Sequence, residues 1–199
     1  MKRITLIGLL MLLFLFPATT LAATPLETVR ANVNKVLEIL RDPTRKAQFA
    51  KEIKEDKIRP VFKDMFDDVE LARRTLGRNW TSLNPSQQEE FVTLFRRVLE
   101  NAYADKILSY KNEQVVFDRE TMIATNRAEV YSRVITSSKE IPVIYRVILK
   151  DGTWRVYDVV IENVSLVQNY RSQFNEILAK NKPDNLLEIL RNKVKEKKS

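Results

Sequence analysis

Carboxylates are the first side chains to consider for chemistry in this sequence, because it contains no histidine and no cysteine. Their absence removes the commonest general base, the thiol nucleophile and the common soft metal ligands. Two pairs of carboxylates stand close together in the chain, Asp67 with Asp68 and Asp158 with Glu162. Neighbouring carboxylates can share a proton when they lie close enough. These four residues are therefore the candidates to weigh against structural roles.

Both pairs fit structural roles better than catalysis. Asp67 and Asp68 directly precede an apolar helical pattern, as a helix N-cap and a first-turn acid do. Asp158 and Glu162 lie on the same face of a predicted strand, too far apart to share a proton while the strand stays regular. The three glycines, at positions 8, 77 and 152, are isolated and form no phosphate-binding loop. We therefore expect no catalytic residue, no metal-ligating residue and a binding protein rather than an enzyme.

Residues 1–23 have the composition of a secretory signal peptide. Two basic residues precede an apolar run over residues 4–16, and small residues follow Pro17. The run has 13 residues, fewer than the roughly 20 that a membrane-spanning helix needs. We expect cleavage after Ala22 or Ala23 and export from the cytoplasm. Since the chain has no cysteine, the exported protein depends on its core alone for stability.

The formal net charge of +8 is concentrated at the two ends of the chain. Lys2 and Arg3 belong to the predicted signal peptide, and residues 191–199 form a basic tail with five basic residues and one acidic residue. The residues between these ends carry 27 basic and 25 acidic side chains. A nucleic-acid-binding protein would show a basic patch with interleaved aromatic residues or a groove-reading helix. Neither is visible, so we expect no nucleic acid as a partner. The tail fits a solvated helix end or weak attraction to anionic head groups and acidic partners.

Residues 24–199 read as a single domain, with a helical first part, a stranded middle and a helical end. Hydrophobic periodicity and capping residues predict helices over residues 25–40, 42–57, 59–66, 68–76, 85–109, 165–179 and 183–195. Runs rich in Val, Ile and Tyr predict strands over residues 114–122, 127–136, 140–150 and 153–161. Asp151-Gly152 between the last two strands is a strong hairpin signal. The short connections favour an antiparallel meander.

The third predicted strand has one fully apolar face. Alternate positions on that face are occupied by Ile141, Val143, Tyr145, Val147 and Leu149, and the opposite face is mixed. Helices that cover the apolar face give an α+β fold. The pattern leaves open whether this face packs against helices as ordinary core or lines a cavity.

Three stretches of the chain resemble the periplasmic phospholipid-binding proteins of the MlaC, or toluene-tolerance, family. The first runs from Phe66 to Leu76-Gly77-Arg-Asn-Trp80, and the second is Leu83-Asn-Pro-Ser-Gln-Gln-Glu-Glu-Phe91. The third and most specific contains Tyr157-Asp158, Glu162, Val164-Ser165-Leu166 and Asn169-Tyr-Arg-Ser-Gln-Phe174. Asn163 stands where the family pattern has Gly, and Asn tolerates left-handed backbone angles.

The resemblance implies a fold, a function and partners. The fold would be a strongly twisted, antiparallel four-stranded sheet with helices that enclose an apolar pocket, an NTF2-like cup. The function would be that of a soluble periplasmic carrier that shelters acyl chains and helps to maintain the lipid asymmetry of the outer membrane. The partners would be an inner-membrane ABC transporter complex, met through its MCE-domain subunit, and an outer-membrane lipoprotein–porin complex. We expect a monomer with no cofactor, in which glycerophospholipid is the cargo.

The residues expected to contact lipid lie on apolar faces that meet between the sheet and the helices. They are Leu76, Phe91, Phe95, Leu99, Val130, Val143, Tyr145, Val147, Val156, Val160 and Phe174. Arg146 and Arg171 are candidates for the head-group rim, with a structural ion pair or a solvated side chain as the alternative. Tyr157, Asp158 and Tyr170 are expected to fix the hinge between the last strand and the following helix.

Two other functions remain open from the sequence. One is a secreted adaptor that binds partners through its surface and has a fully packed core. The other is a small α+β cup with enzyme activity that depends on a carboxylate such as Asp158. Bound diacyl lipid would distinguish the carrier from both.

Overall fold

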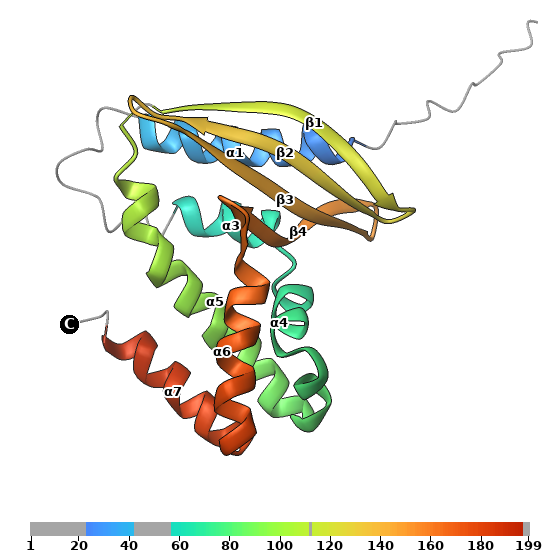
Figure 1. The fold of residues 1–199 in the computed structure, drawn as a ribbon, viewed down its shortest axis with the longest axis vertical. Coiled ribbons are helices and arrows are strands. Elements are labelled where there is room, and N and C mark those ends of the chain that lie inside the picture. The colour runs from blue at the N-terminus through green and yellow to red at the C-terminus, as the bar shows by residue number, and fades with distance from the viewer. Residues whose placement is uncertain (1–22, 42–56, 112, 197–199) are drawn as a thin grey trace, which may run out of the picture.

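The computed structural model describes residues 23–41, 57–111 and 113–196 (Figure 1). Its helices are α1 (Pro25–Arg41), α3 (Arg59–Met65), α4 (Asp68–Leu76), the 3-10 helix η3 (Gly77–Ser82), α5 (Pro85–Leu108), α6 (Leu166–Lys180) and α7 (Pro183–Glu196). Its strands are β1 (Gln114–Ala124), β2 (Arg127–Ile135), β3 (Glu140–Lys150), β4 (Thr153–Ile161) and β5 (Val164–Ser165). The predicted signal peptide and the predicted helix over 42–57 fall almost entirely outside the described residues.

The helix starts predicted from the capping residues Asp67 and Asn84 are confirmed. Asn84 and Gln87 form a reciprocal capping box at the start of α5, with hydrogen bonds of 2.9 and 3.0 Å between side chains and backbone. The side chain of Asp67 accepts a hydrogen bond from the backbone N–H of Glu70 at 2.9 Å and so caps α4. These local interactions fix where the two helices that border the candidate site begin.

The five strands form one antiparallel sheet in the order β1-β2-β3-β4-β5. The prediction of four strands is wrong, because the chain reverses once more after β4. Glu162 and Asn163 have φ angles of 49° and 66°, and Ile161 and Val164 pair on either side of them. Two left-handed residues between paired strands are typical of a tight hairpin turn. The residue that replaces the family's Gly therefore adopts the left-handed angle expected of it.

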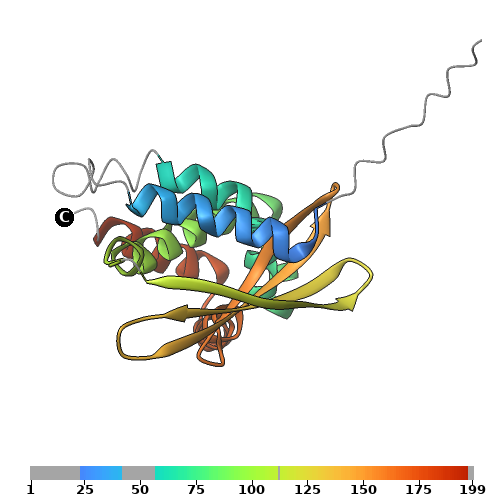
Figure 2. The same cartoon turned by 90° about the horizontal axis from the view of Figure 1, so that it is seen from above.

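Helix α1 lies along one face of the twisted sheet, and α3 lies beside it (Figures 1 and 2). The apolar stripe of α1 buries Val29 at 2% exposure against Val130, Val147 and Val156 of the sheet. Trp154, Ala128 and Met65 complete this cluster. The part of the predicted apolar face of β3 that carries Val147 is thus covered by α1.

The other helices pack together on the far side of α3 and form a second core (Figure 1). Four aromatic rings from α5 and α6 pack together in this core, those of Phe91, Phe95, Tyr170 and Phe174. The centroids of rings in contact lie 5.0 to 5.7 Å apart, in stacked, tilted and edge-on arrangements. Helix α7 adds Leu186, Leu187 and Leu190, each at most 1% exposed. The molecule therefore has two apolar clusters, one centred on the sheet and one among the helices.

Asp158 on β4 joins the sheet to the start of α6. Its carboxylate accepts hydrogen bonds from the Ser165 hydroxyl at 2.7 Å and from the backbone N–H of Val167 at 3.0 Å. Arg146 on β3 donates to the same carboxylate at 3.1 Å. With Asp158 only 2% exposed, these three partners satisfy a buried charge. The predicted role of Asp158 in fixing the hinge is confirmed.

Candidate ligand-binding cavity

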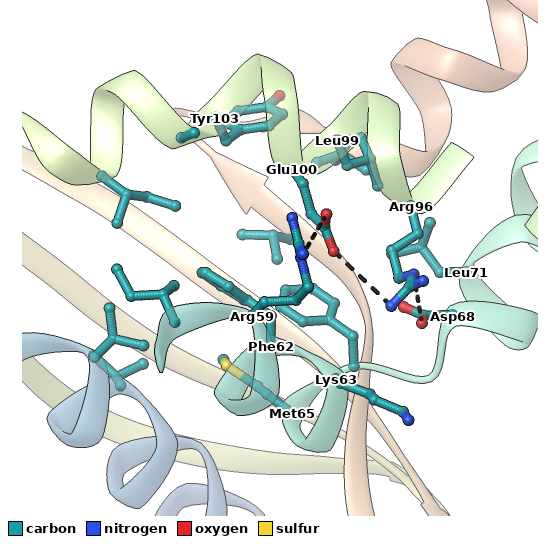
Figure 3. Close-up of a pocket in the computed structure, with 18 of the residues that line it drawn as sticks. Arg59, Phe62, Lys63, Met65, Asp68, Leu71, Arg96, Leu99, Glu100 and Tyr103 are labelled. Atoms are coloured by element: carbon teal, nitrogen blue, oxygen red, sulfur yellow. Dashed lines mark ion pairs between the residues drawn. The ribbon is translucent and has the colours of Figure 1, made fainter. Parts of the chain in front are cut away.

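A cavity of about 330 Å³ lies where the sheet-centred and helix-centred clusters meet. Helix α1 contributes Val33, Val36 and Leu37, and α3 with the residue before it contributes Ile58, Phe62 and Met65. Helix α5 contributes Phe95, Leu99, Tyr103, Ala104 and Ile107. Phe66, Leu71, Tyr145, Val159, Ile161 and Leu166 complete the apolar wall. Figure 3 shows Leu99, Tyr103, Phe62 and Met65 around this space.

Helical periodicity explains why one side of α5 faces the cavity. Phe95, Leu99 and Tyr103 are spaced four residues apart, so they lie in a row along one face of the helix. Phe95 is 1% exposed and belongs to the helical core, whereas Leu99 and Tyr103 keep partial exposure where they border the cavity. The row therefore leads from a filled core into the empty space.

Five charged side chains line one part of the cavity border, namely Arg59, Lys63, Asp68, Arg96 and Glu100. Four of them form a chain of ion pairs, drawn as dashed lines in Figure 3. Arg59 Nε lies 3.4 Å from Glu100, and Arg96 lies 4.0 Å from Glu100 and 3.7 Å from Asp68. The side chains of Arg59 and Arg96 are 44% and 32% exposed, so this part of the border meets solvent.

Burial raises the pKa of the Asp68 carboxyl from 3.8 to about 6. The positive charge of Arg96 lowers this pKa, and the negative charges of Glu100 and Asp67 raise it. Deeper in the cavity, burial raises the pKa of Tyr145 to about 12, and a hydrogen bond with Ser132 acts in the opposite direction. The wall is thus apolar and uncharged, and the border carries the ionisable groups.

The arrangement suits the binding of an apolar molecule. No group of carboxylates in the described part of the chain could hold a metal ion. Asp158 is the carboxylate on which the alternative enzyme function would depend. It accepts hydrogen bonds from Ser165, Val167 and Arg146 and does not line the cavity. Within residues 23–41, 57–111 and 113–196, no helix has the length and apolar character needed to cross a membrane.

Three of the predicted lipid-contact residues, Phe95, Leu99 and Tyr145, line the cavity. The other eight do not line it in this structure. Leu76, Phe91 and Phe174 are buried in the helical core, and Val130, Val147 and Val156 are buried between α1 and the sheet. Val143 and Val160 are buried on the sheet at 6% exposure. Strand and helix alternation marks a buried face without showing whether a neighbouring side chain fills the space beside it.

The two arginines predicted at the head-group rim have structural partners away from the cavity. Arg146 donates to Glu129 at 2.9 Å and to Asp158 at 3.1 Å. Arg171 donates from Nε to the backbone oxygen of Arg74 at 2.8 Å and also donates to it from Nη2. The alternative of a structural role therefore describes both residues in this structure.

Sequence reasoning missed the cavity residues of α1 and α3 and all five charged residues of the border. The apolar stripe of α1, including Val33 and Val36, was recognisable from its spacing. On α5, Arg96 and Glu100 are four residues apart and flank Leu99, so they mark the edge of its apolar face. No local sequence pattern indicates that Arg59 lies near Glu100. The two residues are 41 positions apart, and only the packing of α3 against α5 places them together.

Comparison with known proteins identifies relatives over most of the chain. A sequence model of a family described as "MlaC protein" matches residues 30–192. A toluene tolerance protein, ttg2D, from Pseudomonas putida is 24% identical over 180 residues, which cover 89% of this chain and 84% of that protein. The intermembrane phospholipid transport system binding protein MlaC of Haemophilus influenzae is 26% identical over 119 residues, which cover 57% of this chain and 56% of that protein.

The fold has a close counterpart among solved structures. A phospholipid-binding protein from Ralstonia solanacearum, solved in complex with a phospholipid, superposes with a TM-score of 0.76 at 24% sequence identity. The match covers 89% of this chain and 100% of that protein. The α+β fold expected from the sequence is confirmed, with five strands in place of four.

Proposed function

Since the chain belongs to the MlaC family, we propose that it is a phospholipid carrier that holds acyl chains in the cavity between the sheet and the helices. The observation that carries this proposal is the cavity itself, whose wall is apolar and whose charged groups are confined to the border. The phospholipid bound to the Ralstonia protein and the name of the Haemophilus relative support the same ligand class.

The physical need for such a cavity follows from the cost of exposing acyl chains to water. Each methylene moved out of water contributes about 0.8 kcal/mol, so exposing a diacyl lipid with roughly 25 methylenes to water costs on the order of 20 kcal/mol. Apolar walls from α1, α3, α5 and the sheet offer contacts of this kind without directional constraints. The head group faces solvent at the charged border, because burying a phosphate without partners would be costly.

We further propose that the protein shuttles lipid through the periplasm between an inner-membrane ABC transporter complex and an outer-membrane lipoprotein–porin complex. Support comes from the family, from the relative named for intermembrane phospholipid transport and from the signal-peptide pattern of residues 1–23. Purified protein loaded with labelled phospholipid should pass that label to membranes containing either complex. Passive transfer at the same rate to membranes without the complexes would contradict the shuttle.

Lipid content of the purified protein tests the carrier function directly. The protein is expressed with its own N-terminal segment and purified without detergent. Its bound lipid is then measured by native mass spectrometry and by lipid extraction. We expect bound diacyl phospholipid, and uptake of labelled phospholipid from vesicles after delipidation. A protein that is lipid-free on purification and takes up no lipid would overturn the proposal and favour a surface-binding adaptor.

The mass of the mature protein tests the predicted export. Cleavage after Ala22 or Ala23 leaves a chain that begins at Ala23 or Thr24, directly before α1. Intact-mass measurement of the periplasmic fraction should show one of these two N-termini. Recovery of the uncleaved chain in the cytoplasm would contradict the predicted localisation.

A further inference from the structure

The charged border of the cavity contains cations that are only loosely paired. Arg59 and Arg96 lie 3.4 to 4.0 Å from Glu100 and Asp68, beyond the usual hydrogen-bond range of about 2.7–3.2 Å. Elsewhere in the protein, arginines hold carboxylates much more closely. Arg73 and Arg74 both lie 2.7 Å from Glu70, and the pairs of Arg133 are 2.6 and 2.8 Å long.

The balance of charge at the border is positive. Arg59, Lys63 and Arg96 face two carboxylates, those of Asp68 and Glu100. Burial disfavours the ionised form of Asp68, because its pKa is raised to about 6. The border therefore carries at least one positive charge that its own carboxylates do not neutralise.

The position of these cations relative to the apolar wall is also specific. Arg96 precedes Leu99 by three residues and Tyr103 by seven, so all three lie on the same side of α5. Arg59 lies on α3 across from Glu100, as Figure 3 shows. A molecule whose chains lie against Leu99 and Tyr103 thus presents its next polar group to the two guanidinium groups.

We infer that Arg59 and Arg96 form a phosphate site at the cavity border, which binds the phosphate of a lipid whose acyl chains occupy the cavity. Asp68 and Glu100 hold the two guanidinium groups in position while the site is empty, and the phosphate replaces them as acceptor. Guanidinium groups suit this exchange, because a phosphate accepts bidentate, charge-assisted hydrogen bonds that the present spacing does not provide. This site rests on the proposed carrier function and adds a preference for a phosphate-bearing polar group.

Two lipids with the same acyl chains, with and without phosphate, separate the site from the cavity. Delipidated protein is incubated with vesicles that contain either labelled phosphatidic acid or labelled diacylglycerol, and bound label is measured after the vesicles are removed. We expect the double variant Arg59→Gln/Arg96→Gln to bind phosphatidic acid about tenfold more weakly than the wild type, since two charge-assisted contacts are lost. Binding of diacylglycerol should change less than twofold.

Arg97→Gln is the matched control. Arg97 is the next residue on α5, but it borders the groove between α5 and α7 and does not line the cavity. This variant removes one positive charge from the same helix, so it should bind both lipids as the wild type does.

A second variant should change the affinity for phosphatidic acid in the opposite direction. Asp68→Asn removes a competing acceptor, so it should strengthen binding of phosphatidic acid without affecting binding of diacylglycerol.

The outcomes distinguish the site from the function on which it rests. Unchanged binding of phosphatidic acid by the double variant, or an equal loss of both lipids, overturns the phosphate site and leaves the carrier function in place. Failure of the wild type to bind either lipid overturns the carrier function itself. Displacement of bound phosphatidic acid by millimolar inorganic phosphate would assign the site to free phosphate and overturn the lipid as its source.

Discussion

Two carboxylates that the fold removes at least partly from water, Asp158 and Asp68, behave differently. Asp158 is enclosed by three hydrogen-bond donors and serves as a structural anion. Asp68 has a weaker partner, Arg96 at 3.7 Å, and burial raises its pKa to about 6. The first residue stabilises the fold, whereas the second costs free energy while it is ionised, which is the pattern expected at a binding site.

Substitution of Asp68 tests this difference through the pH dependence of stability. Between about pH 4 and pH 6, folded protein keeps a proton on Asp68 that the unfolded chain has lost, so the contribution of Asp68 to the free energy of unfolding falls as pH rises through this window. Asn cannot ionise and escapes this cost. Asp68→Asn should equal the wild type at pH 4 and exceed it by about 1–2 kcal/mol at pH 7.5, allowing for partial exposure.

Urea denaturation at several pH values measures this effect, and Asp64→Asn is the control. Asp64 lies on the exposed side of α3 and does not line the cavity. Its substitution should leave the pH dependence unchanged. A constant difference between Asp68→Asn and the wild type across the whole pH range would show that ionisation of Asp68 is not the cause.

Connections between elements decide how the sheet and the helices meet. The hairpin turn at Glu162-Asn163 reverses β4 into β5, and Ser165 then caps α6 through a hydrogen bond to the Gln168 N–H at 3.1 Å. Asp158 binds the same Ser165 hydroxyl and the N–H of Val167. The junction between strand and helix is therefore held by backbone angles and by one buried carboxylate.

Backbone angles at the turn predict that two substitutions of Asn163 differ in their effect on stability. Its φ of 66° lies in the left-handed region, which glycine adopts freely and β-branched residues resist. Asn163→Gly should leave the free energy of unfolding within roughly 0.5 kcal/mol of the wild type, whereas Asn163→Val should lower it by about 1–2 kcal/mol. Equal stability of the two variants in chemical denaturation would contradict this account of the turn.

Removal of the Asp158 charge should weaken the junction strongly. Asp158→Asn cannot accept all three hydrogen bonds in the same geometry, and it leaves buried donors of Ser165 and Val167 poorly paired. We expect a loss of about 2–4 kcal/mol in the free energy of unfolding. Asp118→Asn, which breaks an exposed pair with Arg133 on the same sheet, should change stability very little. Similar losses in both variants would contradict a special role for Asp158.

The molecule as a whole separates stability from binding in part, because many side chains of the two filled cores do not line the cavity. Leu187 is 1% exposed in the helical core and does not line the cavity. Ala104 lines the cavity from α5. Substitutions at these two positions should therefore affect different properties.

We expect one of these substitutions to change stability and the other to change lipid binding. Leu187→Ala should lower the free energy of unfolding by about 2–5 kcal/mol, while the protein that remains folded keeps its lipid. Ala104→Trp places a large ring in the cavity and should reduce phospholipid uptake by roughly tenfold, since it occupies space that the chains need. Thermal denaturation and vesicle uptake measure the two properties. Unchanged uptake by Ala104→Trp in a folded protein would place the acyl chains elsewhere.

Local features of the sequence determined the elements and their ends. The capping box of Asn84 and Gln87, the cap at Asp67, the Asp151-Gly152 turn and the alternation of β3 all depend on residues within a few positions of one another. Residues this near in the chain favour the same local structure that the fold uses, so the boundaries of the described helices and strands could be predicted to within a few residues. The short strand β5 was missed because two residues carry no periodicity.

Tertiary structure alone decided which apolar faces are filled and which border a space. Val147 and Tyr145 lie on the same face of β3, yet Val147 is covered by α1 and Tyr145 lines the cavity. Alternation reports burial, but a void depends on whether helices from distant parts of the chain reach that point. The same holds for the charged border, where Arg59, Asp68 and Glu100 come from three helices. Their proximity results from packing, which no spacing within one element encodes.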